Sequence, residues 1–137
     1  MNETIEKSYA GRLEKDIASF FEFDPVRGVY TGMIGLNLSV LWDTIKDFSE
    51  DFEEQTEAFF ILFKELLRRG HLKLQRDGKI IEHTPEEWER IFREVWPESD
   101  MPYGAYEGDI IIWFTHEDCP AYAVWIDPED GSEYWAG

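Results

Sequence analysis

The sequence predicts an α+β fold in one domain that spans residues 1–137. Three observations support this prediction: apolar residues recur at helical spacing in the first half of the chain, an Asp-Gly pair between apolar runs marks a hairpin, and short runs rich in aromatic and β-branched residues follow near the end. Helices that precede a β-hairpin, a further helix and a small C-terminal antiparallel sheet are typical of the α+β class. A chain of 137 residues fits a single domain.

The first predicted helix covers residues 5–21, where apolar side chains recur at every fourth position and charged residues lie between them. The positions of this stripe are Ile5, Tyr9, Leu13, Ile17 and Phe21. Residues 24–36 contain Pro25 and three glycines and are predicted to form a loop. A second, shorter helix is expected at residues 38–48, again from its apolar spacing.

Ser49 is the predicted N-cap of a third helix. The acidic residues at positions 50–54 suit the positive end of a helix dipole, and Arg68, Arg69 and Gly70 are typical of a helix C-terminus. Phenylalanines and leucines between these signals form a wide apolar face. We therefore expect this helix to lie at the centre of the core.

Asp77 and Gly78 predict the two-residue turn of a hairpin over residues 71–83, because both residues tolerate the positive φ angles of a type I′ turn. Such a turn places Lys73 opposite Glu82, so opposite charges meet on one face. The apolar side chains of the two strands then share the other face, which makes this register consistent with a half-buried hairpin.

Thr84 and Glu87 have the spacing of a capping box, with Pro85 at the first helical position. An apolar stripe that begins at Trp88 continues the helix, and Pro97 ends it. The sequence therefore predicts a fourth helix directly after the hairpin.

Residues 109–115 and 121–126 are predicted to be strands, because both are rich in aromatic and β-branched residues. Residues 116–120, with the sequence HEDCP, would join the two strands. A last short strand is expected at residues 133–135. These strands make up the predicted C-terminal sheet.

Residues 114–120, FTHEDCP, hold a histidine, two carboxylates and the only cysteine of the chain. Successive side chains of an extended segment face opposite ways, so these neighbours could not all bind one metal ion, and His71 and His83 fall on opposite faces of the predicted hairpin. A nucleophilic Cys119 would need a base held by tertiary contact, and the nearby acids would raise the pKa of its thiol. We therefore predict a turn here, with no catalytic residue, no metal ligand and no cofactor.

The charge of the chain is uneven. The net charge is −17, and the residues after Arg93 include eleven acids and neither Lys nor Arg. Such density of like charge destabilises a compact state, which suggests a cationic partner, and it disfavours nucleic acid and anionic membranes as partners. The apolar runs are too short to cross a bilayer and the N-terminus lacks the features of a signal peptide, so a cytoplasmic protein is expected.

Aromatic residues alternate with acids in the C-terminal third. This pattern has two interpretations: an ordinary half-buried sheet with an acidic outer face, or a surface that binds a basic protein through aromatic anchors and carboxylates. We favour the second. The predicted contact residues are Tyr103, Tyr106, Glu107, Asp109, Glu117, Asp118, Asp127, Glu129, Asp130, Glu133, Tyr134 and Trp135.

Two alternatives to a binding protein remain. The stretch LLRRGHLKLQRDGKI resembles the wing region of winged-helix proteins, which implies a regulatory or interaction domain, although the acidity of the rest of the chain opposes phosphate binding. A small enzyme of a kind without a known motif is the other alternative. The sequence contains no phosphate-binding loop, dinucleotide-binding glycine pattern or G-x-S-x-G motif that would support it.

Two stretches, FEEQTEAFFILFKELLRRGHLKL with DGK downstream and IIIWFTHEDCPAYAVWI with DGSEYW downstream, resemble a family of small acidic bacterial proteins of the domain of unknown function 596 type. A Phe-rich helix, a hairpin and a late W-F-x-x-x-x-C-P and A-V-W-I segment recur in that family, so the resemblance implies a fold and not a reaction. The similarity covers about residues 40–135.

By its size, its acidity and its lack of catalytic motifs, the chain is also similar to the immunity proteins of bacterial toxin systems, such as those of contact-dependent inhibition. That resemblance implies a cognate partner, namely the basic C-terminal domain of a toxin, commonly a nuclease. It implies that the chain neutralises this toxin by binding and not by catalysis.

Overall fold

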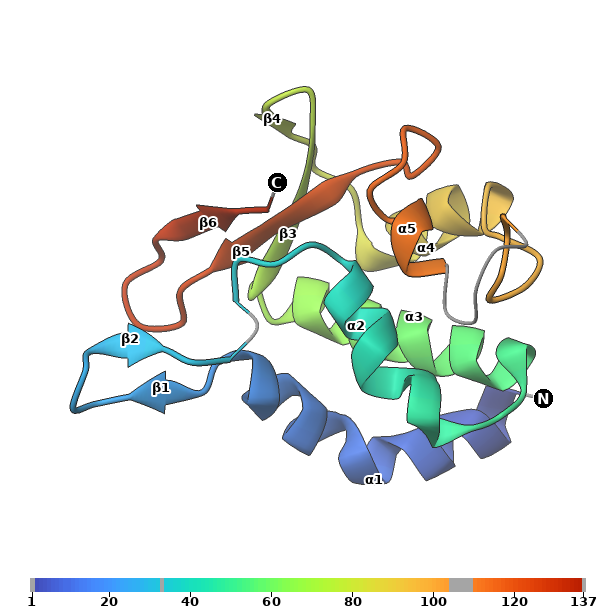
Figure 1. Cartoon of the computed structure of the whole chain (residues 1–137), viewed down its shortest axis with the longest axis horizontal. Coiled ribbons are helices and arrows are strands. Elements are labelled where there is room, and N and C mark those ends of the chain that lie inside the picture. The colour runs from blue at the N-terminus through green and yellow to red at the C-terminus, as the bar shows by residue number, and fades with distance from the viewer. Residues whose placement is uncertain (1, 33, 104–109, 137) are drawn as a thin grey trace.

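The computed structural model describes residues 2–32, 34–103 and 110–136. Its helices lie together, and an antiparallel sheet packs against them (Figure 1). The elements in chain order are α1 (Asn2–Phe20), β1 (Phe23–Asp24), β2 (Val29–Tyr30), α2 (Ser39–Ile45), a 3₁₀ helix (Lys46–Phe48), α3 (Phe52–Arg68), β3 (Leu72–Arg76), β4 (Lys79–Ile80), α4 (Pro85–Glu94), α5 (Ile110–Trp113), β5 (Tyr122–Ile126) and β6 (Glu133–Trp135). The predicted α+β class is confirmed.

The main sheet, as described, has the strand order β4-β3-β5-β6, and each pair of neighbours is antiparallel. Leu72 lies opposite Trp125, and Leu74 lies opposite Ala123. These four side chains are buried against the helices, because residues two apart in a strand share one face. The hairpin and the C-terminal strands therefore form one sheet and not two.

The predicted register of the β3–β4 hairpin is confirmed. Arg76 pairs with Lys79 across the turn, and Lys73 lies 4.0 Å from the carboxylate of Glu82. Asp77 has a φ of 56° and Gly78 a φ of 80°, which are the left-handed conformations that a type I′ turn requires.

α3 lies in the middle of the helical layer, as its apolar face predicts. Phe59 and Phe60 are almost completely buried, and each ring centroid lies 4.9 Å from the ring of Trp96, which follows α4. The indole of Trp96 donates a 3.1 Å hydrogen bond to the hydroxyl of Thr56. The core between α3 and α4 is therefore built mainly from aromatic rings, with the buried polar groups paired.

The two predicted helix caps had different outcomes. The capping box of α4 is confirmed, because Thr84 accepts from the backbone N–H of Glu87, and Glu87 accepts from that of Thr84. The prediction for α3 was wrong: its N-cap is Asp51, which accepts from Glu54 N–H at 3.2 Å. Ser49 lies before the helix, and its hydroxyl donates a hydrogen bond to the carboxylate of Glu54 in the first turn. The helix therefore begins two residues later than a cap at Ser49 would place it.

The segment 24–36 was predicted to be a loop, but part of it forms the β1–β2 hairpin. Asp24 Oδ1 accepts from the backbone N–H groups of Val26 and Arg27, which folds the chain into a tight turn. Gly28 closes the turn with a φ of 70°. The rest of the segment connects this hairpin to α2.

The prediction of a strand at residues 109–115 was wrong, because the described part of this segment starts with the short helix α5. Ile110, Trp113 and Phe114 are buried and Ile112 is 52% exposed, which is helical and not alternating spacing. The Trp113 ring packs 5.4 Å from that of Trp96. The HEDCP segment therefore joins a helix to a strand, although it is a turn, as predicted.

Candidate protein-binding surface

The predicted contact residues do not form one continuous surface, because β5 separates them into two groups. Glu117 and Asp118 precede the strand, whereas Glu129 and Asp130 follow it. A strand of this length spans roughly 16 Å. The two acidic groups therefore lie at opposite ends of β5 and must be assessed separately.

The group before β5 already contains a cation. Arg76 donates a 2.6 Å hydrogen bond to the carbonyl of Cys119 and a 3.2 Å bond to the carbonyl of Glu117. Its guanidinium lies 5.4 Å from the ring centroid of Tyr122. This arginine stabilises the turn and partly offsets its acids, so the turn is a weaker candidate for a cationic partner.

Tyr103 belongs to the same group. Its ring lies 5.8 Å from that of His116, and the residue is 44% exposed. His116 Nδ1 accepts from the backbone N–H of Asp118 at 3.2 Å and lies 3.3 Å from the Asp118 carboxylate. These contacts order the turn locally and leave Glu117 exposed.

Cys119 lies in the interior of the protein. The residue is 0% exposed, and its thiol lies 3.3 Å from the carbonyl of Ala121. Burial raises the pKa of the thiol to about 12, so the cause is loss of water and not the nearby acids. A buried, protonated thiol is a poor nucleophile, and the geometry gives Cys119 a structural role.

The group after β5 is organised around Asp127. Its Oδ1 accepts from the hydroxyl of Tyr30 and from the backbone N–H of Glu129, both at 2.8 Å, and its Oδ2 accepts from Tyr134 at 3.4 Å. These bonds, led by that of Glu129, lower the pKa of the Asp127 carboxyl. Because the residue is only 7% exposed, Asp127 serves the turn itself and we exclude it from the contact surface.

The other acids of this group face solvent. Glu129, Asp130 and Glu133 are exposed, and in the described part of the chain none of them forms an ion pair with a lysine or arginine. Asp130 accepts from Ser132 N–H at 2.9 Å, which shapes the turn without neutralising the charge. We call Glu129, Asp130 and Glu133 the acidic turn.

The two aromatic anchors predicted on β6 lie on opposite faces of the strand. Trp135 is 42% exposed and pairs with Val124 on the face that points away from the helices, whereas Tyr134 is 39% exposed and pairs with Trp125 on the other face. The Trp135 indole donates to Glu133 at 3.0 Å. Both rings border the acidic turn, but one flat partner surface could not cover both completely.

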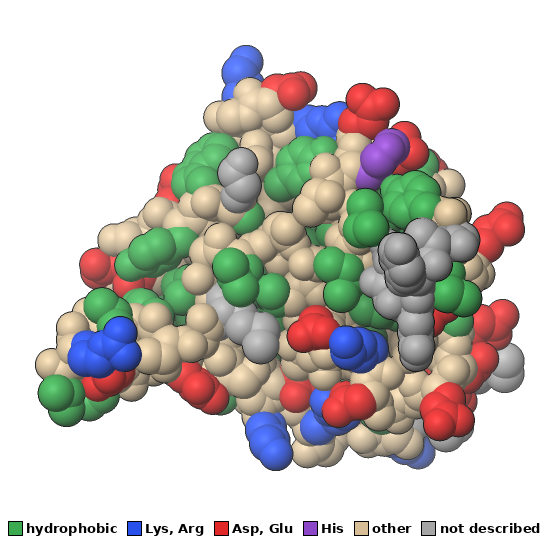
Figure 2. Space-filling model, viewed as in Figure 1, with side chains coloured by type: hydrophobic (Ala, Val, Ile, Leu, Met, Phe, Trp, Pro, Cys, Tyr) green, Lys and Arg blue, Asp and Glu red, His purple; other side chains and the backbone are tan. Residues whose placement is uncertain are grey.

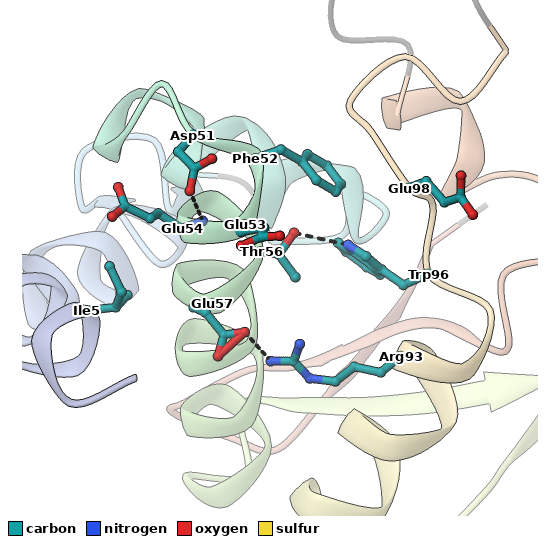
Figure 3. A pocket seen from close by; sticks show the side chains of 10 residues that line it. All are labelled: Ile5, Asp51, Phe52, Glu53, Glu54, Thr56, Glu57, Arg93, Trp96 and Glu98. Carbon is teal, nitrogen blue, oxygen red and sulfur yellow. Dashed lines mark hydrogen bonds and ion pairs between the residues drawn. The ribbon is translucent and has the colours of Figure 1, made fainter. Parts of the chain in front are cut away.

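A second acidic region lines a pocket of about 680 Å³ between α1, the first turns of α3 and the segment after α4 (Figure 3). Its acids at the start of α3 stabilise the positive end of that helix, and Asp51 is the cap. Arg93 lies at the pocket and forms a 2.7 Å ion pair with Glu57. The acids at the start of α3 and the ion pair of Glu57 with Arg93 thus have structural roles that account for their residue types.

Tyr106, Glu107 and Asp109 were also predicted to be contact residues, and they lie outside the described residues.

Among the described residues, no group of three or more histidine, cysteine or acidic side chains has the geometry of a metal site. In the same ranges, no helix combines the length and the apolar composition that a bilayer crossing requires.

The sequence analysis missed the exposed apolar residues of the β1–β2 hairpin. Val26 is 93% exposed, and Phe23 and Val29 are each 44% exposed. The signal was present as apolar residues on both sides of, and within, the turn sequence Asp24 to Gly28, but a turn of this kind has no periodicity from which to infer exposure.

Comparison with known proteins places the chain among bacterial sequences without an assigned activity. A family model described as a protein of unknown function, DUF596, matches residues 67–136. A solved structure of an uncharacterised protein conserved in bacteria, from Neisseria meningitidis, is similar to this chain with 60% sequence identity and a TM-score of 0.81. The matched region covers 98% of this chain and 94% of the Neisseria chain. No curated protein matches the chain significantly.

Proposed function

The chain belongs to the DUF596 family of proteins of unknown function, and from this premise we propose that it is a non-enzymatic protein that binds a basic protein domain. The observation that carries the proposal is the acidic turn, whose three carboxylates are exposed and, in the described ranges, without a basic partner. Opposite charge steers association, and exposed carboxylates of this kind raise the rate at which a cationic protein is captured.

Aromatic side chains next to the acidic turn support the same proposal. Tyr134 and Trp135 are each about two-fifths exposed, and rings at the centre of an interface are common sources of binding energy. Lysine and arginine side chains also stack favourably on such rings. The surface thus combines the charge that attracts a basic protein with the rings that would hold it.

In its more specific form, the proposal is that the chain is an immunity protein that acts in the cytoplasm. The partner would be the basic C-terminal domain of a toxin, a nuclease, which the acidic surface would block. The small size, the net charge of −17 and the buried Cys119 support a role in binding over a role in catalysis.

The test starts from the genes that neighbour the gene of this chain: where one encodes a large secreted protein with a basic C-terminal domain, that domain is the candidate toxin. Coexpression of the chain should restore the growth of cells that this domain inhibits. The association rate, measured by surface plasmon resonance, should fall at least about tenfold between low and physiological salt. A toxin domain that stays toxic and does not bind the chain would refute the immunity proposal.

Charge variants locate the surface. Glu129→Lys with Asp130→Asn removes charge from the acidic turn, and asparagine retains the side-chain oxygen that accepts from Ser132. The matched control, Glu50→Lys with Glu94→Gln, changes the net charge equally at exposed sites elsewhere. We expect the first variant to slow association by about tenfold and the control to have a much smaller effect. Equal effects would show that only the total charge matters.

A further inference from the structure

The β1–β2 hairpin extends away from the body of the molecule and carries exposed apolar side chains at its free end (Figures 1 and 2). Val26, at the turn, is 93% exposed, and Phe23 and Val29 are exposed by 44%. We propose that this hairpin is an aliphatic contact element for the basic partner, in addition to the rings of Tyr134 and Trp135, and docks against an apolar patch that cationic residues flank on that partner. This inference rests on the proposed function and adds an element that would provide further apolar contacts.

The hairpin is ordered by its own polar contacts. Asp24 accepts from Val26 and Arg27 through its side chain and from Gly28 N–H at 2.7 Å through its carbonyl. The rings of Phe23 and Tyr30 pack at 5.0 Å. A loop that is held in one conformation loses little entropy on binding, so the exposed valines are presented at low cost.

The hairpin is also attached to the acidic turn. Tyr30 donates to Asp127, and Asp127 in turn accepts from Glu129 N–H. The apolar end of the hairpin and the carboxylates of the acidic turn are thus parts of one hydrogen-bonded unit. A partner that the acids attract would meet the hairpin at the same docking event.

The chemistry of the surroundings indicates a cationic occupant. Phe23, Val26 and Val29 do not belong to the hydrophobic core of the described chain, so the core does not explain their type. The one basic side chain of the hairpin, Arg27, lies 4.0 Å from Asp24. The acidic turn beside the hairpin is negative, so charge complementarity favours a partner with lysine or arginine around its apolar patch.

Two short peptides test the inference on the full chain: an oligolysine, and a lysine peptide of equal length with interspersed leucines. Binding is followed at low salt by calorimetry and by amide NMR shifts. The leucine-containing peptide should bind about five- to tenfold more tightly and should move the amides of residues 23–30. The oligolysine should move those of residues 127–135 and leave those of residues 23–30 unchanged.

The variant Val26→Ser with Val29→Ser should abolish this gain and leave oligolysine affinity unchanged. Val95→Ser is the control, because Val95 is 47% exposed at the end of α4 and belongs to another surface. If the two peptides bind with equal affinity, or if the leucine-containing peptide still binds more tightly in the hairpin variant, the proposed role of the hairpin is overturned and the proposed function is not. Failure of both peptides to bind at low salt would overturn the proposed function as well.

Discussion

The hydroxyl of Tyr30 donates a 2.8 Å hydrogen bond to the carboxylate of Asp127, a residue 97 positions later in the chain. This bond joins the β1–β2 hairpin to the turn between β5 and β6. Burial and the bond to Asp127 together raise the pKa of Tyr30 to about 12, so the phenol stays protonated and able to donate throughout the neutral range.

Removal of this bond should loosen the hairpin without unfolding the protein. In Tyr30→Phe, we expect faster hydrogen–deuterium exchange at residues 23–30 and nearly unchanged exchange in α3, because none of residues 23–30 belongs to the core. Tyr134→Phe is the control, since its hydroxyl lies farther from Asp127, at 3.4 Å. Slower or equal exchange in Tyr30→Phe would contradict a role in holding the hairpin.

Two glycine substitutions should have opposite effects on stability. A Cβ on Gly32 would overlap the carbonyl oxygens of Ser19 and Phe20 at the end of α1, so Gly32→Ala should lower the free energy of unfolding by about 1–3 kcal/mol. Gly11 lies inside α1 with open space around it, and Gly11→Ala should raise that free energy by about 1 kcal/mol. Urea denaturation measures both. A neutral Gly32→Ala would mean that this loop does not pack on α1.

Cys119 should resist thiol reagents in the native state. Its burial predicts that Ellman's reagent reacts only as the protein unfolds, whereas rapid reaction of the folded protein would refute the burial. The raised pKa also affects stability: above the unfolded pKa of about 8.5, the unfolded chain loses a proton that the folded chain keeps. The free energy of unfolding should therefore fall as pH rises from about 8.5 towards 12, and less so in Cys119→Ala.

Tyr9 and Asp16 form a buried polar pair inside α1. The hydroxyl of Tyr9 donates to Asp16 Oδ2 at 2.7 Å, and Arg12 donates to the same oxygen at 3.1 Å. Tyr9→Phe should lower the free energy of unfolding by about 1–2 kcal/mol, because a buried carboxylate loses one of its donors. Tyr122→Phe, which removes a bond from the half-buried hydroxyl to the carbonyl of His116, should cost less. A larger loss in Tyr122→Phe would reverse this ranking.

The features that sequence alone predicted are those that local chemistry decides. The Asp77-Gly78 turn and the Thr84 capping box depend on residues within a few positions of each other, and both are confirmed. Residues 110–114 within the segment 109–115 are all apolar, so their pattern fits a strand or a buried helix equally well. Contacts of Trp113 with rings far away in the chain decide for the helix.

The candidate site was predicted in part for the same reason. The sequence pointed to the C-terminal third as the acidic region of the chain, and Glu129 and Asp130 in that region are exposed, which agrees with a surface role. The sequence could not show that β5 separates two acidic groups, or that the carboxylate of Asp127 accepts a hydrogen bond from Tyr30. Both features depend on contacts between segments that are far apart in the chain. The role of the β1–β2 hairpin likewise follows only from its exposure in the folded chain.

The strand order of the main sheet also affects biosynthesis. β5 lies between β3 and β6, so the backbone hydrogen-bonding groups along one edge of β3 stay unpaired until residues 122–126 have emerged from the ribosome. Until then the nascent β3–β4 hairpin has an open strand edge, and open edges of this kind make incompletely folded chains prone to aggregation. The main sheet can therefore form only once β5 is available, late in the synthesis of residues 1–137.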